Sequence, residues 1–205
     1  MTDRKQHWEQ LYANKSSLEV SWYQAEPRLS LELIHRSGLG KDAPLIDVGG
    51  GASLLVDRLL AEGYQRLAVL DISGAALTVA RQRLGAHTAD IEWYEADVTQ
   101  FNAPHPFSLW HDRAVFHFLT AAEDRRRYVD VLRRTLVSGG HVIIAAFALG
   151  GPTLCSGLEI VQYDAAKLMA ELGPKFQLEE QQTETHLTPA GKGQSFGFFR
   201  LRKLD

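Results

Sequence analysis

Short apolar runs alternate with amphipathic stretches along most of this chain. Runs with the length and composition of buried strands occupy residues 45–48, 67–71, 91–95, 107–111 and 141–147. Stretches with helical spacing lie between them at about 53–62, 74–84 and 122–136, and Ser138-Gly139-Gly140 is a typical stop signal for the last helix. This alternation predicts a doubly wound α/β fold, with parallel strands joined by right-handed crossovers.

The last third of the chain has a different pattern. A helix at about 164–172 precedes two extended segments, 176–187 and 195–202, which a Pro- and Gly-containing turn joins. Such a pair predicts an antiparallel hairpin, so the sheet is expected to be seven-stranded and mostly parallel, with helices on both faces. Residues 1–44 are predicted to form a helical lid and substrate segment, and residues 45–205 the core, within one compact domain.

Composition narrows the class of protein. The chain has 205 residues, 45% hydrophobic and 23% charged, which is ordinary for a globular protein with one core. A net charge of −3 and the lack of a Lys/Arg block argue against a nucleic-acid partner. No secretory leader pattern is visible, and no apolar run approaches the roughly 20 residues of a membrane helix. We therefore expect a cytoplasmic protein, monomeric or homodimeric, in which the single Cys155 is an inert, partly buried thiol.

Three consecutive glycines, Gly49, Gly50 and Gly51, follow the first predicted strand and precede a leucine-rich helix. A strand, a tight glycine loop and a helix bring bare backbone up to a nucleotide-like ligand, because a Cβ would block the approach. Asp47 lies inside the end of this strand, where a carboxylate would repel a pyrophosphate. The loop therefore favours a cationic ligand such as S-adenosylmethionine (SAM), which carries an ammonium and a sulfonium.

Further acids, Asp71, Asp97 and Asp112, follow or end the next three strands. The carboxyl ends of parallel strands share one edge of a sheet, so these acids are expected to line one crevice. The chain resembles the class I SAM-dependent methyltransferases, a Rossmann-like superfamily, over residues 30–147 and in its terminal hairpin. The motifs that carry the resemblance are Asp47-Val48-Gly49-Gly50-Gly51, Asp71, Glu95-Ala96-Asp97-Val98 and Leu136-Val137-Ser138-Gly139-Gly140, with Ser53 in place of a third glycine.

This resemblance implies a SAM site with assigned parts. The backbone of the glycine loop would lie beside the methionine part and the ribose, with Asp47 near the ammonium. Asp71 would accept hydrogen bonds from the ribose hydroxyls, and Ile72 would cover one face of the adenine. Asp97 would accept from the adenine amino group, and the Val98 N–H would face a ring nitrogen. No metal ligand set is predicted.

The methyl acceptor is expected at the end of the fourth strand, where the crevice opens. His111 and His117 titrate near neutral pH and are the candidate catalytic groups, as base or acceptor-orienting group. Arg113 is a candidate substrate ligand, or one half of a structural ion pair with Asp112. His186, in the hairpin, is expected to face solvent.

The aromatic residues of the N-terminal segment exceed what a plain amphipathic helix needs. Trp22 and Tyr23 are candidates for the wall of the acceptor pocket, and could contribute a cation–π contact; docking of the segment on the sheet is the alternative. The glycine-rich stretch 148–163 is expected to form a mobile loop at the pocket mouth.

A small-molecule acceptor is favoured, with two alternatives left open. The N-terminal segment also resembles lysine methyltransferases acting on translation factors, although Asp112-Arg113-Ala114-Val115 stands where that branch usually carries an Asp-Lys-Gly-Thr type sequence. A SAM-binding module without turnover is the second alternative. A nicotinamide-dependent oxidoreductase is disfavoured, because Leu54 replaces the last glycine of its fingerprint and Asp97 has no role in it.

Overall fold

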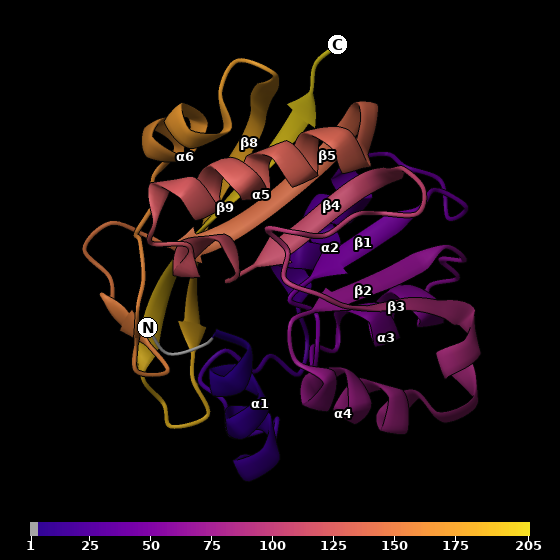
Figure 1. The fold of residues 1–205 in the computed structure, drawn as a ribbon, viewed down its shortest axis with the longest axis vertical. Helices are drawn as coiled ribbons and strands as arrows, with labels where there is room; N and C mark the ends of the chain where they lie inside the picture. Colours follow the sequence, from indigo (N-terminus) through magenta and orange to yellow (C-terminus); the bar gives the residue numbers. More distant parts are fainter. Residues whose placement is uncertain (1–3) are drawn as a thin grey trace.

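A computed structural model describes residues 4–205 as a seven-stranded sheet with the strand order β3-β2-β1-β4-β5-β9-β8 (Figure 1). β1 to β5 are parallel, β9 runs antiparallel to both β5 and β8, and the predicted fold class is therefore confirmed. The strands are β1 (Leu45–Val48), β2 (Leu67–Asp71), β3 (Ile91–Glu95), β4 (Phe107–Arg113), β5 (Leu136–Phe147), β8 (Phe176–Leu187) and β9 (Gly193–Lys203).

Six α-helices accompany the sheet in the described part of the chain. They are α1 (Arg4–Asn14), α2 (Arg28–Arg36), α3 (Leu55–Ala61), α4 (Gly74–Leu84), α5 (Ala122–Thr135) and α6 (Ala165–Leu172). Two 3-10 turns, at Gly85–Asp90 and Phe116–Phe118, and a two-stranded hairpin, β6 (Leu154–Cys155) with β7 (Leu158–Glu159), complete the chain. The hairpin lies within the stretch for which the sequence predicted a mobile loop.

Successive residues of a strand point to opposite faces of the sheet. Helices cover both faces, so side chains on either side of the parallel strands contribute to a core. Ile46 and Trp110 belong to the core cluster that α5 and α6 cover, whereas Leu45 and Leu109 belong to the cluster that α2 and α3 cover. Figure 1 shows α5 and α6 in front of the sheet, with α2 and α3 behind it. The unbroken apolar runs of the parallel strands are explained by this double coverage.

The first two helices differ in how they meet the sheet. α2 buries Leu29, Leu31, Leu33 and Ile34, whereas α1 buries no residue and lies beside α4 (Figure 1). Within the segment predicted as a lid, α2 thus packs on the core, whereas α1 packs beside α4. The division of the chain at residue 44 stays a prediction.

α3 begins at Leu55, close to the predicted start at about residue 53; its N-cap is Leu54, and the Ser53 hydroxyl accepts from Leu55 N at 3.1 Å. One local prediction is wrong. α5 ends at Thr135 and β5 follows at once, so Ser138-Gly139-Gly140 does not terminate a helix. The pairing of β4 with β5 shifts between Phe107 and Leu109, so these turn residues form an irregularity inside a strand.

The hairpin also departs from expectation at His186. This residue is buried, since its Nε2 atom contacts the Ser21 carbonyl oxygen at 2.7 Å and the N-terminal segment covers it. Burial lowers the pKa of His186. The expectation of a solvent-facing histidine is therefore wrong, because the covering segment lies 165 residues away in sequence.

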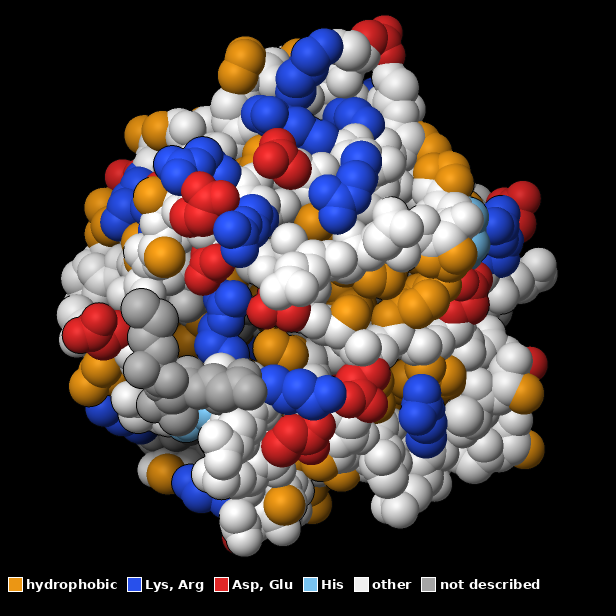
Figure 2. All heavy atoms as spheres, viewed as in Figure 1, with side chains coloured by type: hydrophobic (Ala, Val, Ile, Leu, Met, Phe, Trp, Pro, Cys, Tyr) orange, Lys and Arg blue, Asp and Glu red, His pale blue; other side chains and the backbone are white. Residues whose placement is uncertain are grey.

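Charge is distributed unevenly over the surface. Figure 2 shows Lys and Arg side chains gathered toward the end of the molecule that carries α5 and the C-terminus, away from α1.

No helix within residues 4–205 is both long and apolar enough to span a membrane.

Candidate functional site

A cleft opens at the carboxyl ends of β1, β2 and β4, the edge at which doubly wound sheets bind ligands. Val48, Gly49, Asp71 and Asp97 line one part of it. A second cavity adjoins this cleft, and Asp47, Gly50 and His111 are among the residues that line it. Its lining shares Gly49, Tyr12, Trp22 and Arg113 with that of the first. Asp71 and Asp97 therefore line one crevice as expected, whereas Asp47 lines only the second cavity. The expectation that Asp112 also lines the crevice is wrong, since it lines neither cavity.

The glycine loop leaves no room for side chains. A Cβ at Gly50 would lie 2.5 Å from Asp47 Oδ2, and one at Gly51 would lie 2.5 Å from Asp71 Oδ2. Gly49 adopts a φ of +69°, which other residues rarely take, and a Cβ there would collide with Val115. The loop is thus held against both carboxylates, and its bare backbone faces the cleft.

Asp71 ends β2 and is buried at the floor of the cleft. Its Oδ1 accepts from Ser73 N at 2.9 Å, and Ser73 in turn caps α4 by accepting from Ala76 N at 3.1 Å. Burial raises the pKa of Asp71 to about 7, against the opposing effect of backbone N–H groups. Ile72, the next residue, lines the same cleft.

Asp47 belongs to a buried chain of three side chains. Its Oδ1 contacts His111 Nδ1 at 2.7 Å, and His111 Nε2 contacts Ser30 Oγ at 2.9 Å. Both ring nitrogens of His111 are therefore engaged. Asp47 Oδ2 is buried and has no hydrogen-bond partner within the described residues, so it retains a free acceptor next to the glycine loop. Ser30 was missed by sequence reasoning, because nothing in the pattern of α2 marks it.

Asp97 follows β3 and is held in a tight turn. Its Oδ1 accepts from both Thr99 N and Thr99 Oγ1 at 2.8 Å. Arg4 of α1 donates to the other oxygen at 3.1 Å, and also pairs with Asp124 at 3.2 Å. Val98 is buried beside it and lines the cleft.

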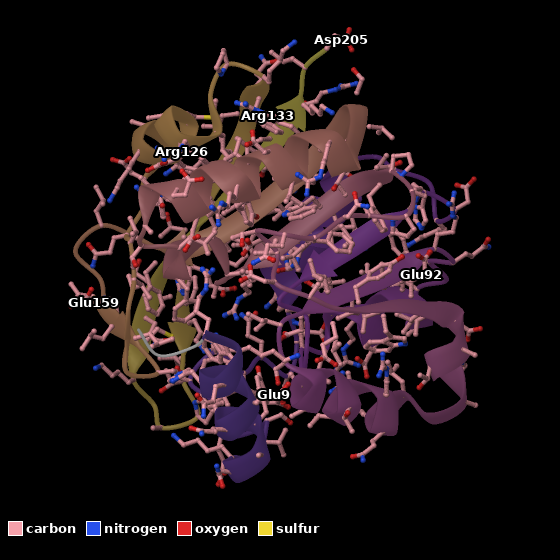
Figure 3. All side chains as sticks on the ribbon, viewed as in Figure 1. Glu9, Glu92, Arg126, Arg133, Glu159 and Asp205 are labelled. Atoms are coloured by element: carbon pink, nitrogen blue, oxygen red, sulfur yellow. The ribbon has the colours of Figure 1, made fainter. Side chains whose placement is uncertain are left out.

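Helix α1 is attached to the site by polar contacts. The Glu9 carboxylate accepts from Gly74 N at 2.7 Å and from Ala75 N at 3.1 Å, the first free amides of α4. Figure 3 places Glu9 between α1 and α4. An acid at a helix N-terminus is stabilised by the helix dipole, so this contact holds α1 across the cleft mouth.

Aromatic rings form the other wall of the cleft. Trp8 stacks edge-on against Trp22, with ring centroids 5.6 Å apart, and against Phe118, at 5.0 Å. Tyr12 meets Trp22 at 6.3 Å, and all four side chains line the cleft. Tyr23 lines only the second cavity. Sequence reasoning singled out Trp22 and Tyr23; Phe118 joins them only through the fold.

Arg113 lies at the end of β4 and lines both cavities. Its Nη1 donates to the Trp22 carbonyl oxygen at 2.9 Å, and its guanidinium carbon lies 4.8 Å from the centre of the Phe196 ring. Burial lowers the pKa of Arg113 to about 10, so the side chain stays charged at neutral pH. The structure shows no ion pair between Arg113 and Asp112.

Asp112 instead fixes the turn that follows β4. It accepts from Val115 N at 2.9 Å and from Phe116 N at 3.1 Å, while Tyr128 Oη donates to its Oδ2 at 2.6 Å. Burial raises the pKa of Asp112 to about 6. Ala114 within this turn has a φ of +72°, an uncommon conformation that the surrounding hydrogen bonds maintain. The network thereby sets the positions of Arg113 and of the cleft wall.

His117 lies apart from these groups. It is fully buried between Phe118 and Phe147, with ring centroids 4.5 Å and 4.9 Å away, and lines neither cavity. Burial lowers its pKa to about 3, so the imidazole is neutral at physiological pH. This placement gives no support to the prediction of a catalytic role for His117.

The last points concern the single cysteine and groups that could hold a metal ion. Cys155 is buried on β6 and lines the cleft, and burial raises the pKa of its thiol, which agrees with an unreactive group. Among residues 4–205, no group of three or more His, Cys, Asp or Glu side chains is arranged to hold a metal ion.

Comparisons with known proteins agree with this geometry. The methyltransferase domain family matches residues 45–140. The eEF1A lysine and N-terminal methyltransferase of Mus musculus is 26% identical over 155 residues, which are 74% of this chain and 21% of that protein. The Danio rerio protein of the same name is 25% identical over 166 residues, 80% of this chain and 22% of that protein. The chain thus spans about a fifth of the length of these relatives.

Solved structures show the same fold. The N-methyltransferase NodS from Bradyrhizobium japonicum WM9, in complex with S-adenosyl-L-homocysteine (SAH), aligns with a TM-score of 0.74 and 20% identity over 99% of this chain and 100% of that chain. A protein solved in work on the conversion of a disulfide bond into a thioacetal group during echinomycin biosynthesis aligns with a TM-score of 0.80 and 15% identity, covering 98% of this chain and 92% of that one. Residues 45–140 thus match the methyltransferase domain family, and the chain shares its fold with methyltransferases, including one solved in complex with SAH.

Proposed function

We propose that this chain transfers a methyl group from SAM to a small-molecule acceptor. The observation that carries the proposal is the shared cleft: the aromatic side chains of Trp8, Trp22 and Phe118 line the same cavity as Gly49 and Asp71. A wall of this kind suits an acceptor with a flat or apolar body, and it excludes water from the space beside the donor.

Each part of the donor has a matching group in the cleft. Asp71 would accept hydrogen bonds from the ribose hydroxyls, and the free Oδ2 of Asp47 would accept from the ammonium. Asp97 and the Val98 N–H would recognise the adenine, with Ile72 against its face. The backbone of Gly49–Gly51 would lie beside the methionine chain. These assignments rest on the position of each group and on the family that residues 45–140 match.

Catalysis in this site would rest on alignment. When bound, SAM supplies an electrophilic methyl group on a positively charged sulfur. The donor-side acids would hold the nucleoside and the aromatic wall would hold the acceptor, so that the acceptor atom lies in line behind the methyl group. α1, attached through Glu9, would close the cleft mouth.

Among residues 4–205, the side chains that line the cleft offer no free base at the acceptor end. His111 is engaged at both nitrogens, and we assign it as a positioning residue that orients Asp47. Tyr12 and Cys155 line the cleft, but burial raises the pKa of each, so both stay protonated at neutral pH. An acceptor that already presents an unprotonated lone pair suits this site best.

Methylation of a protein lysine is the second candidate, favoured by the similarity to the eEF1A lysine and N-terminal methyltransferase. A lysine side chain would have to reach the sulfur past α1 and the aromatic wall. The two candidates predict different substrates: a panel of small molecules should accept labelled methyl groups in the first case, and eEF1A-derived peptides in the second.

The proposal is tested with Trp22→Ala and a matched control, Trp93→Ala, whose ring packs under Arg81 and lines neither cavity. SAH binding is measured by calorimetry and methyl transfer with labelled SAM. We expect Trp22→Ala to raise the acceptor KM by about tenfold, as loss of an aromatic contact suggests, and Trp93→Ala to leave it unchanged. A chain that binds SAH but methylates neither panel would instead be a binding module.

A further inference from the structure

Arg113 has unused hydrogen-bonding capacity inside the cavity that receives the acceptor. One of its terminal nitrogens donates to the Trp22 carbonyl oxygen, whereas Nε and Nη2 are buried and find no acceptor among the described residues. These two N–H groups lie on one edge of the guanidinium, the edge whose spacing matches the two oxygens of a carboxylate. Charged N–H groups left unpaired in a protein interior cost free energy, so such an edge is characteristic of a binding site.

No carboxylate of the described chain neutralises this cation directly. Glu184 and Asp47 lie near enough for their charges to be felt at Arg113, but neither forms an ion pair with it. Each carboxylate has a partner elsewhere: Gln24 donates to Glu184 at 2.9 Å, and Asp47 contacts His111 at 2.7 Å. The positive charge is thus available to a ligand.

The contacts of Arg113 belong to the acceptor side of the cleft. Its guanidinium stacks on Phe196 of β9, is tied to Trp22, and lies near Cys155 of β6. The groups assigned to ribose and adenine lie on the other side of β1: Asp71 ends β2 and Asp97 follows β3. Arg4, the other cation lining the cleft, is already paired with Asp97 and Asp124.

We propose that Arg113 binds a carboxylate of the methyl acceptor, so that the acceptor is a small aromatic or apolar acid. This inference rests on the proposed function and deepens it by naming the substrate class. The Nε–Nη2 edge would take the two carboxylate oxygens, while the rings of the aromatic wall cover the body of the molecule. Both nitrogens are buried in this structure, so the groups that cover them must shift for a carboxylate to reach this edge.

The methionine chain of SAM also ends in a carboxylate, and Arg113 lines both cavities. The carboxylate of SAM and the carboxylate of the acceptor are distinguished by measuring the binding of donor and of acceptor separately. With SAH saturating, the probes are benzoate, phenylacetate and indole-3-acetate, each beside its primary amide, which has the same shape without the charge. Binding is followed by equilibrium dialysis, and by quenching of the fluorescence of Trp8 and Trp22.

We expect at least one acid to bind ten times or more tightly than its amide. Arg113→Met should abolish this preference, Arg113→Lys should keep part of it, and the surface control Arg127→Met should leave it unchanged. In all three variants SAH affinity should stay within about threefold of the parent. Equal binding of acids and amides, or no acid binding at all, overturns the inference, as does a tenfold loss of SAH affinity in Arg113→Met, which would assign the residue to the donor.

Thermal unfolding without ligand provides a second measurement. If Arg113 is held for a ligand, replacing it by Met removes an unpaired buried cation, and the melting temperature should stay equal or rise. If Arg113 instead stabilises the fold through Trp22 and Phe196, the melting temperature should fall, and the inference is overturned. Failure of the parent to bind SAH would refute the proposed function itself, which separates the two results.

Discussion

Replacing Asp71 by Asn keeps the shape of the side chain and removes its charge. The carboxylate is assigned two hydrogen bonds from the ribose, and hydrogen bonds to charged groups contribute about 1.5–3 kcal/mol each. Asn retains one acceptor oxygen without a charge, so about 2–4 kcal/mol of binding free energy should be lost, a roughly 30- to 1,000-fold weaker affinity. The parent should bind SAH more tightly as the pH rises through about 7, because Asp71 ionises there.

The same substitution should change stability in the opposite direction. The pKa of Asp71 is about 7 when folded against an ordinary value of 3.8, so the folded state favours the protonated form. A raised pKa means that the contribution of this group to stability is complete below pH 3.8 and is lost as the pH rises through about 7. Asn does not ionise, so the free energy of unfolding of Asp71→Asn relative to that of the parent should increase as the pH rises over this window. The difference should then level off at no more than about 4 kcal/mol.

The measurements are calorimetric titration with SAH at pH 8, and urea unfolding at pH 5 and pH 8. Asp130→Asn, an exposed aspartate on α5, is the matched control and should change neither result. Near-normal SAH affinity in Asp71→Asn would refute the ribose assignment. A difference in unfolding free energy that does not increase between pH 5 and pH 8 would refute the argument from burial.

Three further substitutions test the parts that support the site. Glu9→Gln should weaken the attachment of α1 by about 1 kcal/mol and speed hydrogen exchange of α1; unchanged exchange would contradict the lid contact. His111→Ala should lower SAH affinity about tenfold by releasing Asp47, and it should leave the pH profile of turnover intact. If the pH profile of turnover instead lost one limb in His111→Ala, His111 would act as a catalytic base. Tyr128→Phe should destabilise the protein by about 2–4 kcal/mol, measured by urea unfolding, because Asp112 loses a buried donor. A smaller effect would mean that water replaces the hydroxyl.

Local, repeated features could be predicted from the sequence. The apolar runs marked the strands, because a strand covered on both faces must be apolar throughout. The acids Asp71 and Asp97 could be placed in the crevice because the carboxyl ends of parallel strands meet at one edge. Turn residues were less informative: Gly139 was interpreted as a helix stop, whereas it lies in an irregular strand.

The pairing of single side chains depended on the tertiary structure. His111 and His117 have the same chemistry and lie six residues apart, yet one holds Asp47 and the other is packed between aromatic rings. Ser30 meets His111 from 81 residues away, a contact that no local pattern encodes. Nor does the sequence show that Asp112 bonds to backbone amides and Tyr128 and leaves Arg113 without an ion pair.

The sequence by itself thus determined the fold class and the position of Asp71 and Asp97 at one crevice, because both follow from periodicity and from the chain's course past one edge of the sheet. The tertiary structure decided which polar groups are satisfied and which stay available, because that depends on distances of a few ångströms between elements far apart in the chain. The unpaired edge of Arg113 is of this second kind, and on it rests the inference about the acceptor.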